Sequence, residues 1–157
     1  MSTERWIAGS GQGLTWGNAY TAASTFNSIV NGNAIISDLQ IDNSTALDIF
    51  ADFGFNGGSV TTVAPNYIGV YLYPLNSDGS TYGDGRFGSS AAGPPPSTYY
   101  VGSIGLPVGT QALDGTIRGI ILPPGKFKFL IYNQAGVTLA GSGGNTLLYR
   151  SYNRSVT

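Results

Sequence analysis

Hydrophobic and polar residues alternate along much of the chain from residue 33 onward, and Gly, Pro, Asn and Asp separate the alternating stretches. In residues 67–74, for example, Ile68 and Val70 fall on one side of the pattern. A period of two residues is typical of a β-strand with one buried face. The pattern therefore predicts antiparallel strands.

The same alternation recurs in stretches at 34–41, 46–55, 67–74, 98–104, 113–122, 126–132 and 145–152. In 46–55 it places Leu47 and Ile49 on the inner face of a strand. It places Asp48 and Asp52 on the outer face. Short turn sequences, and no helical pattern, lie between the stretches. We therefore expect an all-β fold, an antiparallel jelly-roll-like β-sandwich of about eight strands.

Two segments depart from the alternation. Residues 1–33 contain many small polar residues and predict an extended N-terminal arm in front of a sandwich domain at 34–157. Residues 76–97 are rich in Gly and Ser, end near three consecutive prolines, and predict a long loop within that domain. Loops of this length inside a compact domain are usually functional or mobile.

Ionisable side chains are scarce, and this narrows the function. The 157 residues include 7 Lys+Arg, 8 Asp+Glu, no His and no Cys, with a formal net charge of −1. A Ser-His-Asp triad, a thiolate nucleophile and a sulfur-ligated metal site are therefore excluded. Asp48 and Asp52 share one predicted strand, and at ~3.3 Å per residue they lie about 13 Å apart, too far for a glycosidase pair. We expect no enzyme activity, no cofactor and no metal site.

The same composition limits the partners. Nucleic-acid binding relies on clustered Lys and Arg, and the basic residues here are few and scattered. No stretch approaches the ~18 apolar residues that span a bilayer. We therefore expect neither a nucleic acid nor a membrane as partner.

Aromatic residues stand out instead, with 10 Tyr, 7 Phe and 2 Trp, or 12% of the chain. Tyr67, Tyr71 and Tyr73 fall on the side of their strand that looks away from the core of the sandwich. Three interpretations fit them: cross-strand packing on an ordinary sheet surface, an oligomer interface, or a platform for a sugar ligand.

The predicted arm supplies a second aromatic set. Trp6 and Trp16, together with Tyr20 and Phe26, are candidate anchors in the groove of a partner protein. The alternative is that the two tryptophans fold back onto their own sandwich.

A resemblance to a known class of proteins lies in TFNS at 25–28, NSTALDIFAD at 43–52, LPPGKFKF at 122–129 and NQAG at 133–136. With these stretches the chain resembles virion structural proteins of tailed bacteriophages, and in particular small head decoration (cement) proteins, some of which are jelly rolls. The resemblance spans most of residues 25–152. It carries over no catalytic residue.

The resemblance implies a protein that is made in the host cytoplasm and binds the major capsid protein on the outside of an icosahedral capsid. Such proteins are often dimers or trimers and tie neighbouring shell subunits together. The alternative function is that of a carbohydrate-binding β-sandwich in a phage fibre or adhesin, which would use exposed tyrosines and Asp/Asn loops.

Overall fold

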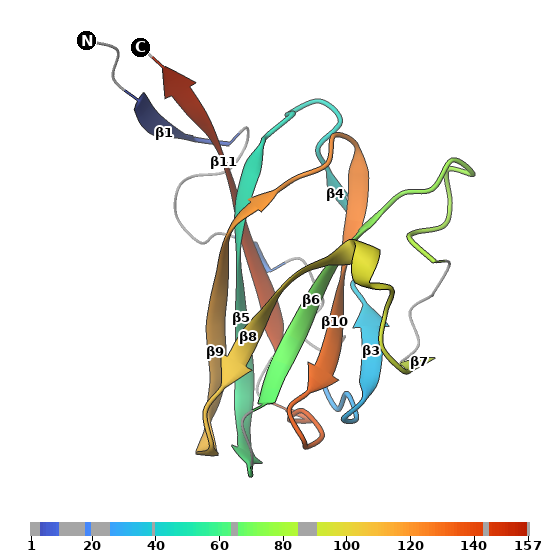
Figure 1. The fold of residues 1–157 in the computed structure, drawn as a ribbon, viewed down its shortest axis with the longest axis vertical. Coiled ribbons are helices and arrows are strands. Elements are labelled where there is room, and N and C mark those ends of the chain that lie inside the picture. The colour runs from blue at the N-terminus through green and yellow to red at the C-terminus, as the bar shows by residue number, and fades with distance from the viewer. Residues whose placement is uncertain are drawn as a thin grey trace.

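The structure is a computed structural model that describes residues 4–9, 18–19, 26–38, 40–63, 66–84, 91–142 and 145–156. The strands form two antiparallel sheets that pack face to face (Figure 1). This confirms the predicted all-β sandwich. The described part of the chain has one short 3-10 turn, η1 (Ser97–Tyr99), and contains no helix long and apolar enough to cross a membrane.

The first sheet has the strand order β1-β11-β5-β9. Its strands are β1 (Glu4–Ala8), β2 (Asn18–Ala19), β5 (Phe50–Thr62), β9 (Gly109–Ile121) and β11 (Thr146–Val156). The short β2 also pairs with β11. Every pairing in this sheet is antiparallel.

The second sheet has the strand order β7-β3-β10-β6-β8. Its strands are β3 (Asn33–Ile36), β4 (Ile41–Asp42), β6 (Asn66–Pro74), β7 (Ala91–Ala92), β8 (Tyr100–Leu106) and β10 (Lys126–Gln134). The short β4 pairs with the first residues of β10. The strands predicted at 67–74 and 126–132 are both present, because their strict alternation matches a sheet with one face in the core.

The main core lies between the two sheets and is rich in phenylalanine. Phe53 on β5 and Phe129 on β10 meet at the centre, with ring centroids 4.3 Å apart. Tyr149 on β11 contacts both rings, at 5.5 and 6.4 Å. Aromatic pairs of this kind stabilise a fold beyond their buried area, so these rings fix how the two sheets face each other.

The described parts of the predicted N-terminal arm are built into the sandwich. β1 and β2 both pair with β11. Phe26 and Ile29 are 0% and 2% exposed and belong to the main core. Residues 1–33 thus contribute strands to the first sheet although they show no alternation, because the long β11 pairs with these short segments.

Candidate functional site

β1 and the last residues of β11 form a two-stranded ribbon that extends beyond the rest of the sandwich (Figure 1). The pairing of β11 with β5 ends at Tyr152, whereas its pairing with β1 continues to Val156. Trp6 is 56% exposed on this ribbon and Ile7 is 38% exposed. A two-stranded ribbon alone is marginally stable in water, so a partner that covers it would stabilise it.

An aromatic cluster holds Trp6 in place at the foot of the ribbon. The Trp6 ring meets Tyr152 edge-on at 5.2 Å and Phe50 edge-on at 5.9 Å. Phe50 and Tyr152 stack on each other at 5.8 Å. These contacts fix the indole while more than half of its surface stays open to a partner.

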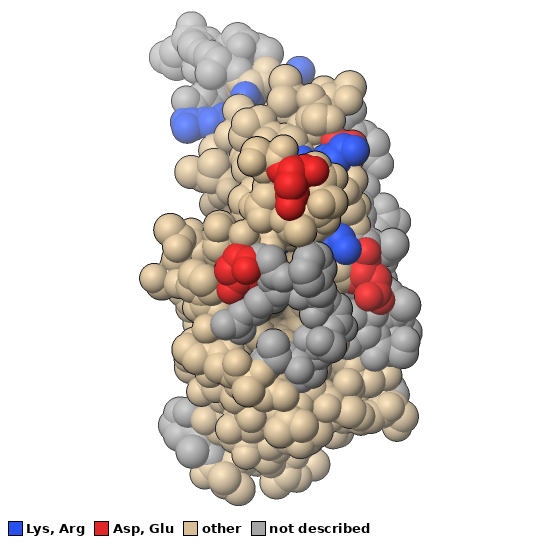
Figure 2. Space-filling model, turned by 90° about the vertical axis from the view of Figure 1, so that its right-hand side faces the viewer, with Lys and Arg blue, Asp and Glu red and all other residues tan. Residues whose placement is uncertain are grey.

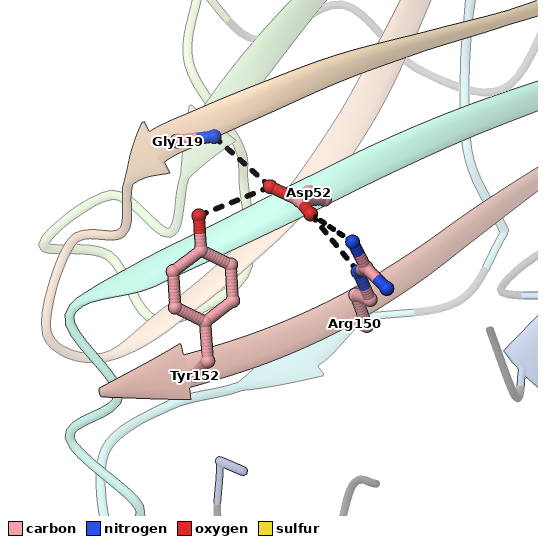
Figure 3. Close-up of polar contacts among 4 residues, drawn as sticks. All are labelled: Asp52, Gly119, Arg150 and Tyr152. Carbon is pink, nitrogen blue, oxygen red and sulfur yellow. Dashed lines mark hydrogen bonds and ion pairs between the residues drawn. The ribbon is translucent and has the colours of Figure 1, made fainter. Parts of the chain in front are cut away.

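An ion pair between the buried Asp52 and the half-buried Arg150 lies on β5 and β11 (Figure 3). The Asp52 carboxylate is 3% exposed and accepts two hydrogen bonds from the Arg150 guanidinium, at 2.9 and 2.6 Å. It also accepts one from the Tyr152 hydroxyl and one from the backbone N–H of Gly119, each at 3.0 Å. The pairing of β5 with β9 shifts register at Asp52, and Gly119 has a φ of 69°, so a β-bulge aims this N–H at the carboxylate.

Electrostatics indicate that Asp52 is structural. Burial acts to raise the pKa of Asp52, but the hydrogen bonds from Arg150, Gly119 and Tyr152 outweigh burial and hold that pKa below its ordinary value. Burial and the bond to Asp52 raise the pKa of the Tyr152 hydroxyl. Asp52 therefore stays ionised, and its donors within the chain compensate its charge. Asp52 lies on the predicted outer face of its strand, opposite the core residue Phe53, but it is not exposed there, because Arg150 and Tyr152 enclose it.

The loop before β5 presents two aliphatic side chains to solvent. The sequence pattern places Leu47 and Ile49 in the core, but the structure shows them 57% and 48% exposed. The strand starts only at Phe50 because residues 44–46 form a turn and Leu47 has a φ of 50°. The alternation before residue 50 therefore does not correspond to strand geometry.

Hydrogen bonds hold this loop rigidly. The Asn43 side-chain amide donates to the backbone carbonyl of Asp48 at 2.9 Å, and its oxygen accepts from the N–H of Asp48 at 2.8 Å. The Asp48 carboxylate is 3% exposed and accepts from Ser151 and Asn153 on β11. Leu47 and Ile49 are thus exposed on a fixed backbone.

Ile121, at the end of β9, adds a third aliphatic residue to this region and is 72% exposed. The carbonyl of Ile49 accepts a hydrogen bond from the N–H of Leu122, which ties the two loops together. The exposed Pro124 lines one hollow with Leu47 and Ile49. We call the surface formed by Trp6, Leu47, Ile49, Ile121 and Pro124 the apolar end.

A groove opens beside the apolar end, with a volume of about 540 Å³. Its walls come from the start of β8, the end of β6 and the turn between β9 and β10. The lining residues are Leu72, Pro74, Thr98, Tyr99, Tyr100, Val101, Ile121, Leu122, Pro123 and Pro124. The lining contains no ionisable side chain other than tyrosine, so the groove suits an uncharged ligand or side chain.

The predicted tyrosine face lies on the outer side of the second sheet, but most of it is covered. Tyr73 is 0% exposed and Tyr71 is 7% exposed. They pack in a second cluster with Tyr82 from the 76–97 loop and with Tyr132 on β10. Only Tyr67, at 41% exposed, is open to solvent among the three predicted tyrosines. The long loop folds back over this side of the sheet, which the strand pattern alone does not reveal.

The remaining predicted interface residues divide into two groups. Phe26 is fully buried in the main core, so it is not available to a partner and the prediction for this residue is corrected. Trp16 and Tyr20 lie outside the described residues. Trp6 is the residue of this set that the structure places on the surface.

Comparisons with known proteins give little further information. No family model and no curated protein matches the chain. Among solved structures, the chain is similar to the CBM36-1 domain of a multidomain xylanase from the hindgut metagenome of Trinervitermes trinervoides. The match has 12% identity and a TM-score of 0.35, and it covers 99% of this chain and 97% of that one. A similarity this low transfers no function.

Proposed function

We propose that the protein is a non-catalytic structural protein that docks through its apolar end on other protein subunits, and that these subunits are the outer shell of an icosahedral phage capsid. The observation that carries the proposal is the exposure of Trp6, Ile49 and Ile121 at one end of the sandwich, at 56%, 48% and 72%. The resemblance of the sequence to head decoration proteins supports a capsid shell as the partner.

The apolar end has the properties of a protein interface. Contiguous exposed apolar surface marks interaction sites in soluble proteins. The Trp6 ring is held by Tyr152 and Phe50, so little freedom of this side chain is lost when a partner covers it. Such pre-ordered aromatic groups are typical anchors of an interface.

Charged residues border this surface. Asp42 and Lys126 form an exposed ion pair of 3.6 Å beside the loop of Asn43. Figure 2 shows the charged side chains on one face of the molecule in its upper and middle parts, and none in its lower part. An apolar centre with a charged rim is the usual arrangement of a protein–protein interface.

Repetition makes a modest interface sufficient. A shell offers many equivalent binding places. When a copy contacts two shell subunits, the first contact raises the effective concentration for the second one. A small domain with one docking end can therefore decorate a shell without a large interface per copy.

The docking surface is tested with two single variants, Trp6→Ala and Ile121→Ser. We expect each to weaken binding to the shell at least tenfold, because loss of an interface anchor costs about 2 kcal/mol or more. Binding is measured by co-sedimentation with shells of the encoding phage that were prepared without this protein. Circular dichroism checks that each variant is folded.

Val108→Ser provides the matched control. Val108 is an exposed aliphatic residue, at 58%, next to the opposite end of the strand that carries Ile121. This variant is expected to bind the shell like the unchanged chain. The proposal is wrong if the unchanged chain does not sediment with shells, or if Val108→Ser weakens binding as much as Ile121→Ser.

A further inference from the structure

Four tyrosines gather on the outer side of the second sheet. Tyr67 and Tyr71 lie on β6, Tyr100 on β8 and Tyr132 on β10. The register pairs Tyr71 with Tyr100, and the two rings meet at 5.3 Å. The register also pairs Tyr132 with Gly69, which lies between Tyr67 and Tyr71 along β6. The four side chains therefore share one surface.

Gly69 lets these rings lie close to the backbone. A Cβ at this position would lie 3.2 Å from the ring of Tyr71 and 3.7 Å from the ring of Tyr67. The two rings thus converge over the glycine and cover a stretch of sheet that has no side chain of its own. The rings therefore form a shallow aromatic surface close to the backbone. A larger residue at position 69 would push the rings away.

The four tyrosines differ in exposure, and the difference divides their roles. Tyr71 and Tyr132 are 7% and 8% exposed and act as the support. Tyr67 and Tyr100 are 41% and 45% exposed and are open to a ligand. Burial and the neighbouring tyrosines raise the pKa of Tyr71, so its hydroxyl stays protonated and uncharged at neutral pH.

The surroundings of the exposed rings are open and neutral. Gly105 is paired with Tyr67 on β8, and a Cβ there would meet nothing within 4 Å. The exposed Ser103 is paired with Gly69 and offers a hydroxyl. β6 and β8 contain no Asp, Glu, Lys or Arg, and the two lysines of β10, Lys126 and Lys128, lie in the first half of that strand, before Tyr132.

These features select the class of ligand. A nucleic acid stacks on aromatic rings but also needs several cations for its phosphates. The strands of this surface carry only two, Lys126 and Lys128 on β10, and of these Lys126 pairs with Asp42 and Lys128 lies over the ring of Tyr82 at 5.1 Å. An acidic polysaccharide also needs cations, which bind its acidic groups. A neutral sugar presents apolar C–H groups on the face of its ring and hydroxyls around the edge. Tyrosine rings with their hydroxyls and a neighbouring serine match both parts.

We propose that Tyr67 and Tyr100, supported by Tyr71 and Tyr132, form a platform that binds neutral saccharide units of a polysaccharide. Tyr100 also lines the groove beside the apolar end, whereas Tyr67, Tyr71 and Tyr132 do not. The platform therefore adjoins the shell-binding surface at Tyr100 and extends over the outer side of the second sheet, where it meets a glycan outside the shell. Because the platform is shallow and open, we expect weak binding to single sugars and stronger binding to chains that contact both rings.

The experiment is affinity electrophoresis of the full chain in native gels that contain a soluble neutral glucan, xylan, mannan or galactan. We expect at least one of them to retard the protein. Tyr67→Ala and Tyr100→Ala should each weaken this retardation about fivefold or more, since a lost ring contact costs of that order. Tyr67→Phe keeps the ring and should retain most of the binding. Trp6→Ala, at the other surface, should bind the glycan unchanged.

Three results would overturn the proposal: no retardation by any of the four polysaccharides, retardation that persists in a Tyr67→Ala/Tyr100→Ala double variant, or binding of alginate in preference to every neutral chain. Sedimentation velocity tests whether a second copy of the chain, instead of a glycan, occupies the tyrosine surface. If the unchanged chain self-associates and the double variant is monomeric, the tyrosines form a contact between copies and the glycan site is rejected. None of these results depends on shell binding.

Discussion

Phe129→Ala is expected to lower the free energy of unfolding by about 4 kcal/mol, the usual cost of removing a fully buried phenylalanine. Phe129 is 0% exposed, and its ring contacts Phe53 and Tyr149 of the opposite sheet, at 4.3 and 6.4 Å. Truncation leaves a cavity between the sheets that these large rings cannot fill without moving. Since small domains have a total stability of about 5–15 kcal/mol, much of it is lost.

Urea unfolding followed by tyrosine and tryptophan fluorescence measures this effect. Val63→Ala is the control, because Val63 is 77% exposed and its truncation should change stability by less than about 0.5 kcal/mol. Equal stabilities of Phe129→Ala and Val63→Ala would contradict the placement of Phe129 at the centre of the sandwich.

Arg150→Met is expected to destabilise the fold by about 3 kcal/mol, because it leaves the buried Asp52 carboxylate without its counter-charge. Arg150 is the donor of two of the hydrogen bonds to this carboxylate. An Asp52→Asn/Arg150→Met double variant removes both charges and should recover part of the loss. Arg118→Met, on an exposed position of β9, should change stability by less than about 0.5 kcal/mol.

The effect of Arg150→Met should depend on pH. In the unchanged chain the pKa of Asp52 lies below its ordinary value, so the ion pair stabilises the fold above about pH 4. This contribution is lost as pH falls through the lowered pKa. In Arg150→Met the bonds from Gly119 and Tyr152 remain, but the lowering by Arg150 is lost, so the pKa of the Asp52 carboxyl rises relative to the unchanged chain. The gap in stability between the two proteins should therefore narrow below about pH 4, and a constant gap from pH 7 to pH 3 would show that Arg150 acts through packing alone.

The alternation of residues was sufficient to predict the fold class and the central strands. β6 and β10 lie where the sequence places them, because each has one face in the core and its pattern depends only on neighbours two residues apart. The burial of Phe53 and Phe129 follows from the same rule.

Long-range contacts explain what the sequence did not reveal. Asp52 and Arg150 are 98 residues apart in the chain, so nothing local shows that they pair. Leu47 lies outside the core because Asn43 and Asp48 fix a turn through bonds that include Ser151 on β11. Tyr73 is buried because the 76–97 loop returns over its sheet.

The candidate surfaces were predictable only in part. Trp6 was predicted as an anchor for a partner, with packing on its own sandwich as the alternative. The structure shows it packed on Phe50 and Tyr152 and still 56% exposed, so its role as an anchor stays a prediction. The exposure of Ile121 was not predicted, because the residue lies in the stretch 113–122 that was predicted as one strand. The adjacent Ile120 and Ile121 nevertheless break the alternation, which indicates that one of them faces outward. Tyr100 gave a similar signal, as the second residue of a Tyr-Tyr pair at the start of β8.

Cryo-microscopy of the capsid particles on which we propose that the protein sits tests the central proposal most directly. We predict one sandwich at each equivalent position on the outside of the shell, present in stoichiometric ratio to the major capsid protein. The ribbon of β1 and β11, with Trp6 and Ile121, should contact the shell, and Tyr67 should face away from it. Absence of the sandwich from the shell, a handful of copies on a tail or fibre, or an orientation with the apolar end in solvent would contradict docking through the apolar end.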